Sequence, residues 1–97
     1  MKPQFHFSES AWERNNTRLT NQIFKLLPMF ENGEDWNKQL STIVMELHGY
    51  NAMFESNSDF MVLIAKLLAL RNTEGDQIAF RKLVFEAISQ IKEIKTL

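Results

Sequence analysis

Glycine and proline are scarce in this chain, and their scarcity constrains the fold more than any other feature of the sequence. The 97 residues include three glycines and two prolines. An all-β fold needs many tight turns, which these residues normally supply, so such a fold finds little support here. The long segments between the breakers carry apolar residues at helical spacing, and the sequence therefore predicts an all-α fold.

The clearest helical pattern lies in the middle of the chain. Its apolar positions repeat at spacings of 4, 3, 1 and 3, which places them on one helix face: Trp36, Leu40, Ile43, Val44 and Leu47. Asn32-Gly33 marks the preceding turn, and Glu34 and Asp35 favour the positive end of a new helix. Gly49 can adopt the left-handed conformation that ends a helix. We therefore predict a helix over residues 34–48.

A first helix is predicted over residues 10–28. Ser10 and Glu13 have the spacing of a capping box. One apolar stripe follows them: Trp12, Leu19, Ile23, Leu26, Leu27 and Phe30. Pro28 lacks the amide that an α-helix needs at this position, so we expect the helix to end or kink near Leu27.

A third helix, over residues 58–71, is apolar on nearly every side. The stretch from Phe60 to Leu70 is interrupted only by Lys66. A helix that is hydrophobic all round is typically surrounded by others, so we expect it at the centre of the bundle. Eleven helical residues rise only about 16 Å, against roughly 30 Å of bilayer hydrocarbon, so this segment is not predicted to cross a membrane.

A fourth helix is predicted over residues 76–95, after a polar loop. Its core stripe consists of Phe80, Val84, Ala87, Ile88, Ile91 and Ile94. Three further apolar residues, Ile78, Leu83 and Phe85, fall beside this stripe and widen the apolar arc. Such a broad arc indicates that the helix has more than one neighbour.

The segments together predict a single domain over residues 1–97, a compact bundle of about four helices. A fifth, short helical turn fits residues 50–57. Residues 1–9 are expected to form a short extended arm, because Phe5 and Phe7 sit two residues apart, as on one face of a strand.

The residue types that carry catalysis or bind metal are sparse. The chain has no cysteine and two histidines, His6 and His48, and neither histidine belongs to a metal-binding motif. The glycines are not clustered as a phosphate-binding loop requires. His48 at a helix end is favoured by the helix dipole alone. We therefore predict no enzymatic activity, no cofactor, no metal site and no evident small-molecule site.

A basic face on the first helix suggests one alternative function. Arg14, Arg18 and Lys25 lie at helical spacing and could follow a phosphate backbone. A nucleic-acid-binding accessory subunit is therefore an alternative interpretation. The net charge of −1 gives no general attraction to nucleic acid.

The surplus of bulky apolar residues is the main functional clue. Eight phenylalanines, two tryptophans and five methionines are more than a small bundle readily buries. Our leading hypothesis is a non-enzymatic protein-interaction module, most simply a homodimer, whose interface includes Phe5, Phe7, Ile78, Leu83 and Phe85.

Two further expectations complete the hypothesis. A small helical immunity or inhibitor protein is another alternative, on architecture alone. The N-terminus lacks the continuous apolar stretch of a signal peptide, so a cytoplasmic location is expected.

Overall fold

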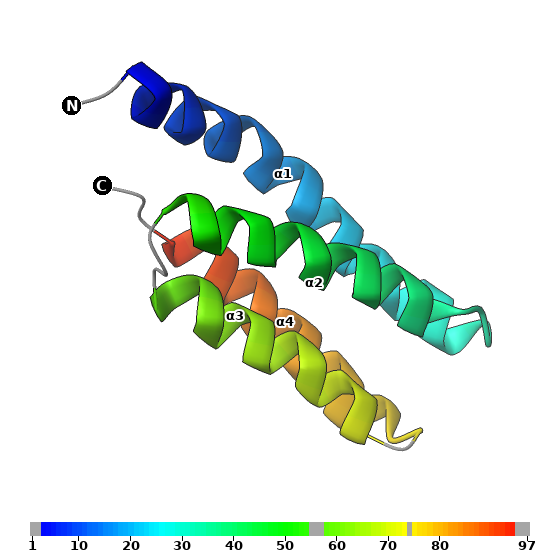
Figure 1. Cartoon of the computed structure of the whole chain (residues 1–97). Helices are drawn as coiled ribbons and strands as arrows, with labels where there is room; N and C mark the ends of the chain where they lie inside the picture. Colours follow the sequence, from blue (N-terminus) through cyan, green and yellow to red (C-terminus); the bar gives the residue numbers. More distant parts are fainter. Residues whose placement is uncertain (1–2, 55–57, 74, 95–97) are drawn as a thin grey trace.

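The computed structural model describes residues 3–54, 58–73 and 75–94, with side chains from Trp12 onwards. These ranges contain four α-helices, α1 (Pro3–Glu31), α2 (Trp36–Met53), α3 (Ser58–Leu68) and α4 (Gln77–Glu93), and the short 3₁₀-helix η1 (Ala69–Asn72) (Figure 1). No strand occurs in the described ranges. The predicted all-α bundle of about four helices is confirmed.

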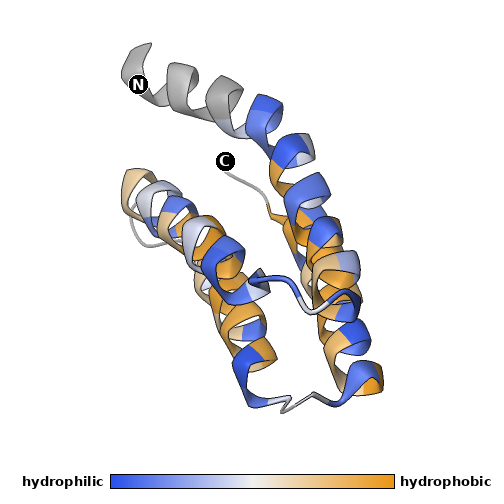
Figure 2. Ribbon diagram, turned by 90° about the vertical axis from the view of Figure 1, so that its right-hand side faces the viewer, coloured by the Kyte–Doolittle hydropathy of each residue, from blue (hydrophilic) through white to orange (hydrophobic). Residues whose placement is uncertain are grey.

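The four helices form a bundle in which α1 and α3 each pack against both α2 and α4. Figure 2 shows that hydrophobic residues gather along the facing sides of the helices, whereas hydrophilic residues predominate on the outer sides. The core thus comes from the apolar stripes seen in the sequence. Its fully buried large side chains are Leu19, Ile23, Leu26, Leu40, Ile43, Leu47, Phe60, Leu63, Leu67, Leu70, Phe80 and Ile91.

Aromatic clusters lie at both ends of this core. At one end, the Trp12 ring meets Tyr50 and Phe60 edge-on, with centroid distances of 5.1 and 4.9 Å. At the other end, Phe30 stacks on Phe80 at 4.0 Å, and the Trp36 ring meets Phe80 edge-on at 4.9 Å. Each such pair contributes about 0.5–1.5 kcal/mol beyond its buried area.

Helix α1 extends further in both directions than predicted. Residues 3–9 are helical, so the expected extended arm over residues 1–9 is wrong there, and residues 1–2 lie outside the described part. Pro3 is tolerated in a first helical turn, and no breaker follows before Pro28. The 29 residues of α1 rise about 43 Å, close to the 46 Å long dimension of the molecule.

Pro28 does not end α1, contrary to the predicted boundary. It lies in the last turns of the helix, and its carbonyl still accepts a hydrogen bond from the Asn32 amide at 2.9 Å. The helix ends at Glu31, and Gly33 just beyond it has a left-handed φ of 71°. The Glu34 amide donates back to the Met29 carbonyl at 2.8 Å, which completes a Schellman cap.

Helix α2 passes through Gly49, so the predicted stop at that residue is also wrong. Asp35 caps the start of the helix by accepting from the Lys38 amide at 3.1 Å. Tyr50 and Phe54 are buried and continue the apolar stripe beyond Gly49, so packing favours a longer helix. The short helical turn expected after residue 49 is the last part of α2, up to Met53.

Helix α3 lies at a corner of the bundle, not at its centre. Two of its apolar side chains, Met61 and Val62, are nearly half exposed. Only the stripe through Phe60 and Leu67 is buried, because α3 packs against α2 and α4 and leaves its outer side uncovered. Lys66 is half-buried beside α4, where its amine lies 3.6 Å from a Glu86 carboxylate oxygen.

Helix α4 begins where the sequence predicts. Asp76 is its N-cap and accepts from the Ile78 and Ala79 amides, each at 3.1 Å. None of the helices, within the described residues, is long and apolar enough to cross a membrane.

Two alanine substitutions test these helix boundaries. Gly33→Ala forces a side chain into left-handed backbone and should lower the free energy of unfolding by about 1 kcal/mol. Gly49→Ala should raise it by about 0.5–1 kcal/mol, because Gly49 is inside a helix and nothing lies within 4 Å of the added Cβ. Urea unfolding followed by circular dichroism measures both. A destabilised Gly49→Ala variant would instead support a helix end at that glycine.

Candidate interaction surface

The predicted interface residues differ in how far their side chains are exposed. Ile78 is 82% exposed and Phe85 is 42% exposed, and both lie on the outer side of α4, two turns apart. Leu83 is half-buried and packs against the core. The side chains of Phe5 and Phe7 lie outside the described part of the chain.

Phe85 forms an exposed aromatic pair with Phe24 of α1. Their ring centroids are 5.9 Å apart and the ring planes meet at 79°, an edge-to-face arrangement. Phe24 is itself 39% exposed. The Arg81 guanidinium lies over the Phe85 ring, 5.9 Å from its centroid, within cation–π range. We call Phe24, Ile78, Arg81 and Phe85 the aromatic patch.

Polar contacts hold α1 and α4 together on both sides of this patch. The Gln77 amide donates to a Glu31 carboxylate oxygen at 2.9 Å, and an Arg81 nitrogen lies 4.0 Å from the same oxygen. Towards the other end of α4, the Asn16 amide donates to the Ile91 carbonyl at 3.1 Å. The patch therefore lies on a helix pair whose relative position is fixed.

Phe24 and Arg81, which belong to the aromatic patch, are not among the interface residues predicted from the sequence. Phe24 lies beside the core stripe of α1, next to Ile23, and so resembled a widened core position. The sequence does show that Phe24 is an aromatic residue beside its core stripe, as Phe85 is beside the stripe of α4. Only the packing of α1 against α4 shows that the two rings meet.

A shallow hollow adjoins Phe85 and is lined by α4 together with Lys66 of α3. Its volume is about 410 Å³, and its lining includes Lys66, Lys82, Phe85, Glu86, Ser89 and Glu93. The apolar wall comes from Phe85, and the rest is polar or charged. The hollow is open to solvent.

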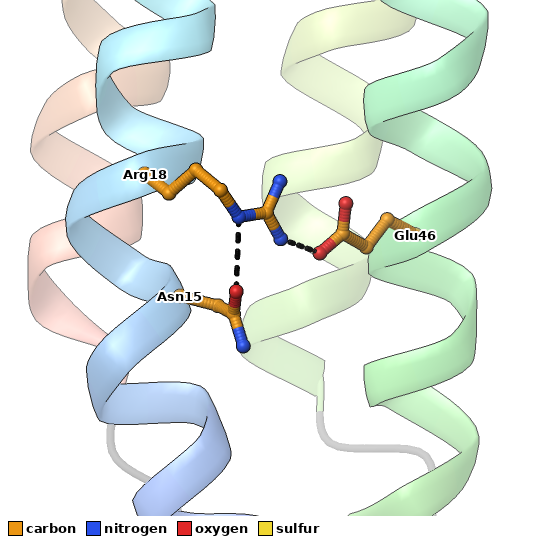
Figure 3. A network of polar contacts seen from close by, with 3 residues as sticks. All are labelled: Asn15, Arg18 and Glu46. Atoms are coloured by element: carbon orange, nitrogen blue, oxygen red, sulfur yellow. Dashed lines mark hydrogen bonds and ion pairs between the residues drawn. The ribbon is translucent and has the colours of Figure 1, made fainter.

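The predicted basic face of α1 is only partly available. Figure 3 shows that the Arg18 guanidinium forms an ion pair with Glu46 of α2. Its Nε also donates to the Asn15 side-chain oxygen at 2.9 Å. The hydrogen bond to Glu46 raises the pKa of Arg18 above its ordinary value. Arg14 and Lys25 are exposed, so the structure keeps two of the three predicted cations free of this network.

The remaining surface offers less defined features. Four apolar side chains are exposed on α2 and α3: Met45, Met53, Met61 and Val62. Arg71 lines a second hollow near the start of α2 and donates to the side-chain oxygens of Asn37 and Ser41, each at 2.7 Å. Within the described residues, no group of three His, Asp or Glu side chains could hold a metal ion.

Comparison with known proteins identifies no relative of this chain. No family model matches the sequence, and neither curated proteins nor solved structures give a match. Any functional inference therefore depends on the surface geometry given above.

Tyr50, at the buried side of the Arg18–Glu46 contact, gives a measurable pH dependence. Burial raises the pKa of Tyr50 above its ordinary value of 10.0, and the nearby Glu46 charge adds to this, while a hydrogen bond with Asn15 opposes it. The folded state therefore holds the phenolic proton more tightly than the unfolded state does. This contribution to stability is complete below pH 10.0 and is lost as the pH rises through the folded-state pKa.

We predict that Tyr50 ionises at higher pH in the folded protein than in urea. The chain has one tyrosine, so the ultraviolet absorbance of tyrosinate reports this residue alone. Tyr50→Phe should also show a smaller alkaline loss of unfolding free energy than the wild type. Identical titration curves in folded and unfolded protein would show that the phenol is solvated.

Proposed function

We propose that this protein is a non-enzymatic interaction module that associates with a second copy through the outer face formed by α1 and α4. The observation that carries the proposal is the aromatic patch, in which two exposed phenylalanine rings and an arginine lie together beside a hollow. Aromatic residues and arginine are enriched at the centres of protein interfaces.

Energetic considerations support a role for this face. Burying one large apolar side chain in a partner stabilises a complex by about 1.5–3 kcal/mol, and Ile78 is 82% exposed in the isolated chain. Phe24 and Phe85 already restrict each other's rotation through their edge-to-face contact. Less side-chain entropy is therefore lost when this pair is covered.

The other proposals find weaker support. Nucleic-acid binding through Arg14, Arg18 and Lys25 is less favoured, because Arg18 is engaged by Glu46 and only two of the three cations lie outside this ion pair. The exposed methionines of α2 and α3 have flexible side chains, and among the described residues of these two helices no aromatic residue is largely exposed. The α1–α4 face therefore best combines exposure, rigidity and aromatic content.

Substitutions in the aromatic patch should weaken self-association. We expect Phe85→Ser, and separately Ile78→Ser, to raise the dissociation constant of the dimer about tenfold or more, because each removes apolar area from the interface. Sedimentation velocity over a concentration series measures this. Ile78 is 82% exposed, so its substitution should leave the fold intact.

Met45→Ser is the matched control, since Met45 is an equally exposed apolar residue on the outer side of α2. It should leave the dissociation constant unchanged. A wild-type protein that stays monomeric at every concentration would refute self-association.

A further inference from the structure

The outer side of α4 carries a ridge of residues with an ordered charge pattern. Ile78, Lys82, Glu86, Ser89 and Glu93 follow one another at spacings of 4, 4, 3 and 4, which places them on one helix face. The cation lies in the N-terminal half of the ridge and Glu93 lies at its C-terminal end. Most of these side chains are exposed, and only that of Glu86 is half-buried.

Two charges of this ridge have no partner of opposite charge within the described residues. Glu86 lies 3.6 Å from Lys66, and the neighbouring Arg81 lies 4.0 Å from Glu31. Lys82 and Glu93, in contrast, form no ion pair in the part of the chain that the structure describes. Both also line the hollow beside Phe85. The unpaired charges thus coincide with the candidate interaction surface.

We propose that a second copy of this chain docks on this ridge with its α4 antiparallel to the first, related by a two-fold axis that passes between residues 87 and 88. This proposal rests on the self-association proposed above and specifies its geometry. In that register, Lys82 of each copy faces Glu93 of the other, and Glu86 faces Ser89 of the other copy. The four polar residues of the ridge, Lys82, Glu86, Ser89 and Glu93, are therefore complementary to the same four residues of the second copy.

Charge decides the relative direction of the two helices. A parallel pairing of the same ridge would place Lys82 against Lys82 and Glu93 against Glu93, and like charges in contact disfavour a complex. The antiparallel pairing turns both contacts into attractive ones. Ser89 is small, so it allows close approach near the axis, and its hydroxyl can donate to the Glu86 carboxylate of the second copy.

The size of the ridge limits the area that a dimer can bury. The 17 residues of α4 rise about 26 Å, and the molecule is 20 Å wide in its second dimension. Such a face buries on the order of 500 Å² per copy, or about 1,000 Å² in total, which is the low end for specific interfaces. We therefore expect a weak dimer that forms reversibly with concentration.

Charge reversal tests the register. Lys82→Glu and Glu93→Lys should each raise the dissociation constant about tenfold, because each turns two attractive contacts into repulsive ones. The double variant should restore the constant to within about threefold of the wild type, since the pairs re-form with exchanged signs. The dissociation constants come from sedimentation velocity at low ionic strength, where screening is weak.

The results of these measurements distinguish a wrong α4 register from a failure of self-association itself. If the wild type dimerises and Phe85→Ser weakens the dimer, but the double charge reversal gives no recovery, the antiparallel α4 register is wrong while self-association stands. If the wild type is monomeric throughout, both proposals fail together.

Cross-linking tests the two-fold axis independently. The chain has no cysteine, so Ser89→Cys introduces a single thiol, one that lies near its copy across the proposed axis. Mild oxidation should give a disulfide-linked dimer at concentrations where the wild type dimerises. Thr42→Cys, an exposed position on α2, is the control and should remain uncross-linked. Absence of the Ser89→Cys cross-link would overturn the register.

Discussion

The two aromatic clusters at the ends of the core fix the arrangement on which the rest of the structure depends. Trp12, Tyr50 and Phe60 join α1, α2 and α3 at one end, and Phe30, Trp36 and Phe80 join α1, α2 and α4 at the other. Wide rings in mutual contact permit few alternative alignments, so they set the relative heights of the helices. The aliphatic stripes between the clusters supply most of the buried area. Residues on the outer sides of the helices can therefore vary without disturbing the packing of the core.

That division separates the phenylalanines whose side chains the structure describes into two groups. Phe30, Phe54, Phe60 and Phe80 contribute to the core or pack against it, whereas Phe24 and Phe85 meet each other on the outside. An exposed aromatic pair stabilises the fold little more than a pair of polar residues at the same positions would. It also leaves apolar area in contact with water. The pair lies on α1 and α4, whose packing is held by hydrogen bonds at both ends of their contact. The apolar surplus noted in the sequence is therefore real, but it is concentrated on particular helix faces.

The sequence was most informative where a stripe was regular, and least informative where tertiary packing opposed a local signal. The stripes of α2 and α4 predicted which residues are buried, and α4 begins within one residue of its predicted start. Gly49 was misread because a glycine can end a helix, but the burial of Tyr50 and Phe54 favours continuing it. Helix α3 was placed centrally because composition alone cannot show that Met61 and Val62 face solvent. The Phe24–Phe85 contact joins residues 61 positions apart, and no local pattern encodes such a contact.

The position of Glu93 shows why the charge pattern of α4 is informative. The C-terminal end of a helix carries partial negative charge, so a carboxylate in the last turn is disfavoured by about 0.3–1 kcal/mol in an isolated helix. Glu93 is the last residue of α4, and no cation of the described chain forms an ion pair with it. A lysine from a second copy would interact favourably with the negative end of the helix dipole. It would also give Glu93 the ion-pair partner that the described chain does not supply. The antiparallel pairing brings Lys82 to this position without any further element, because the same ridge supplies both charges.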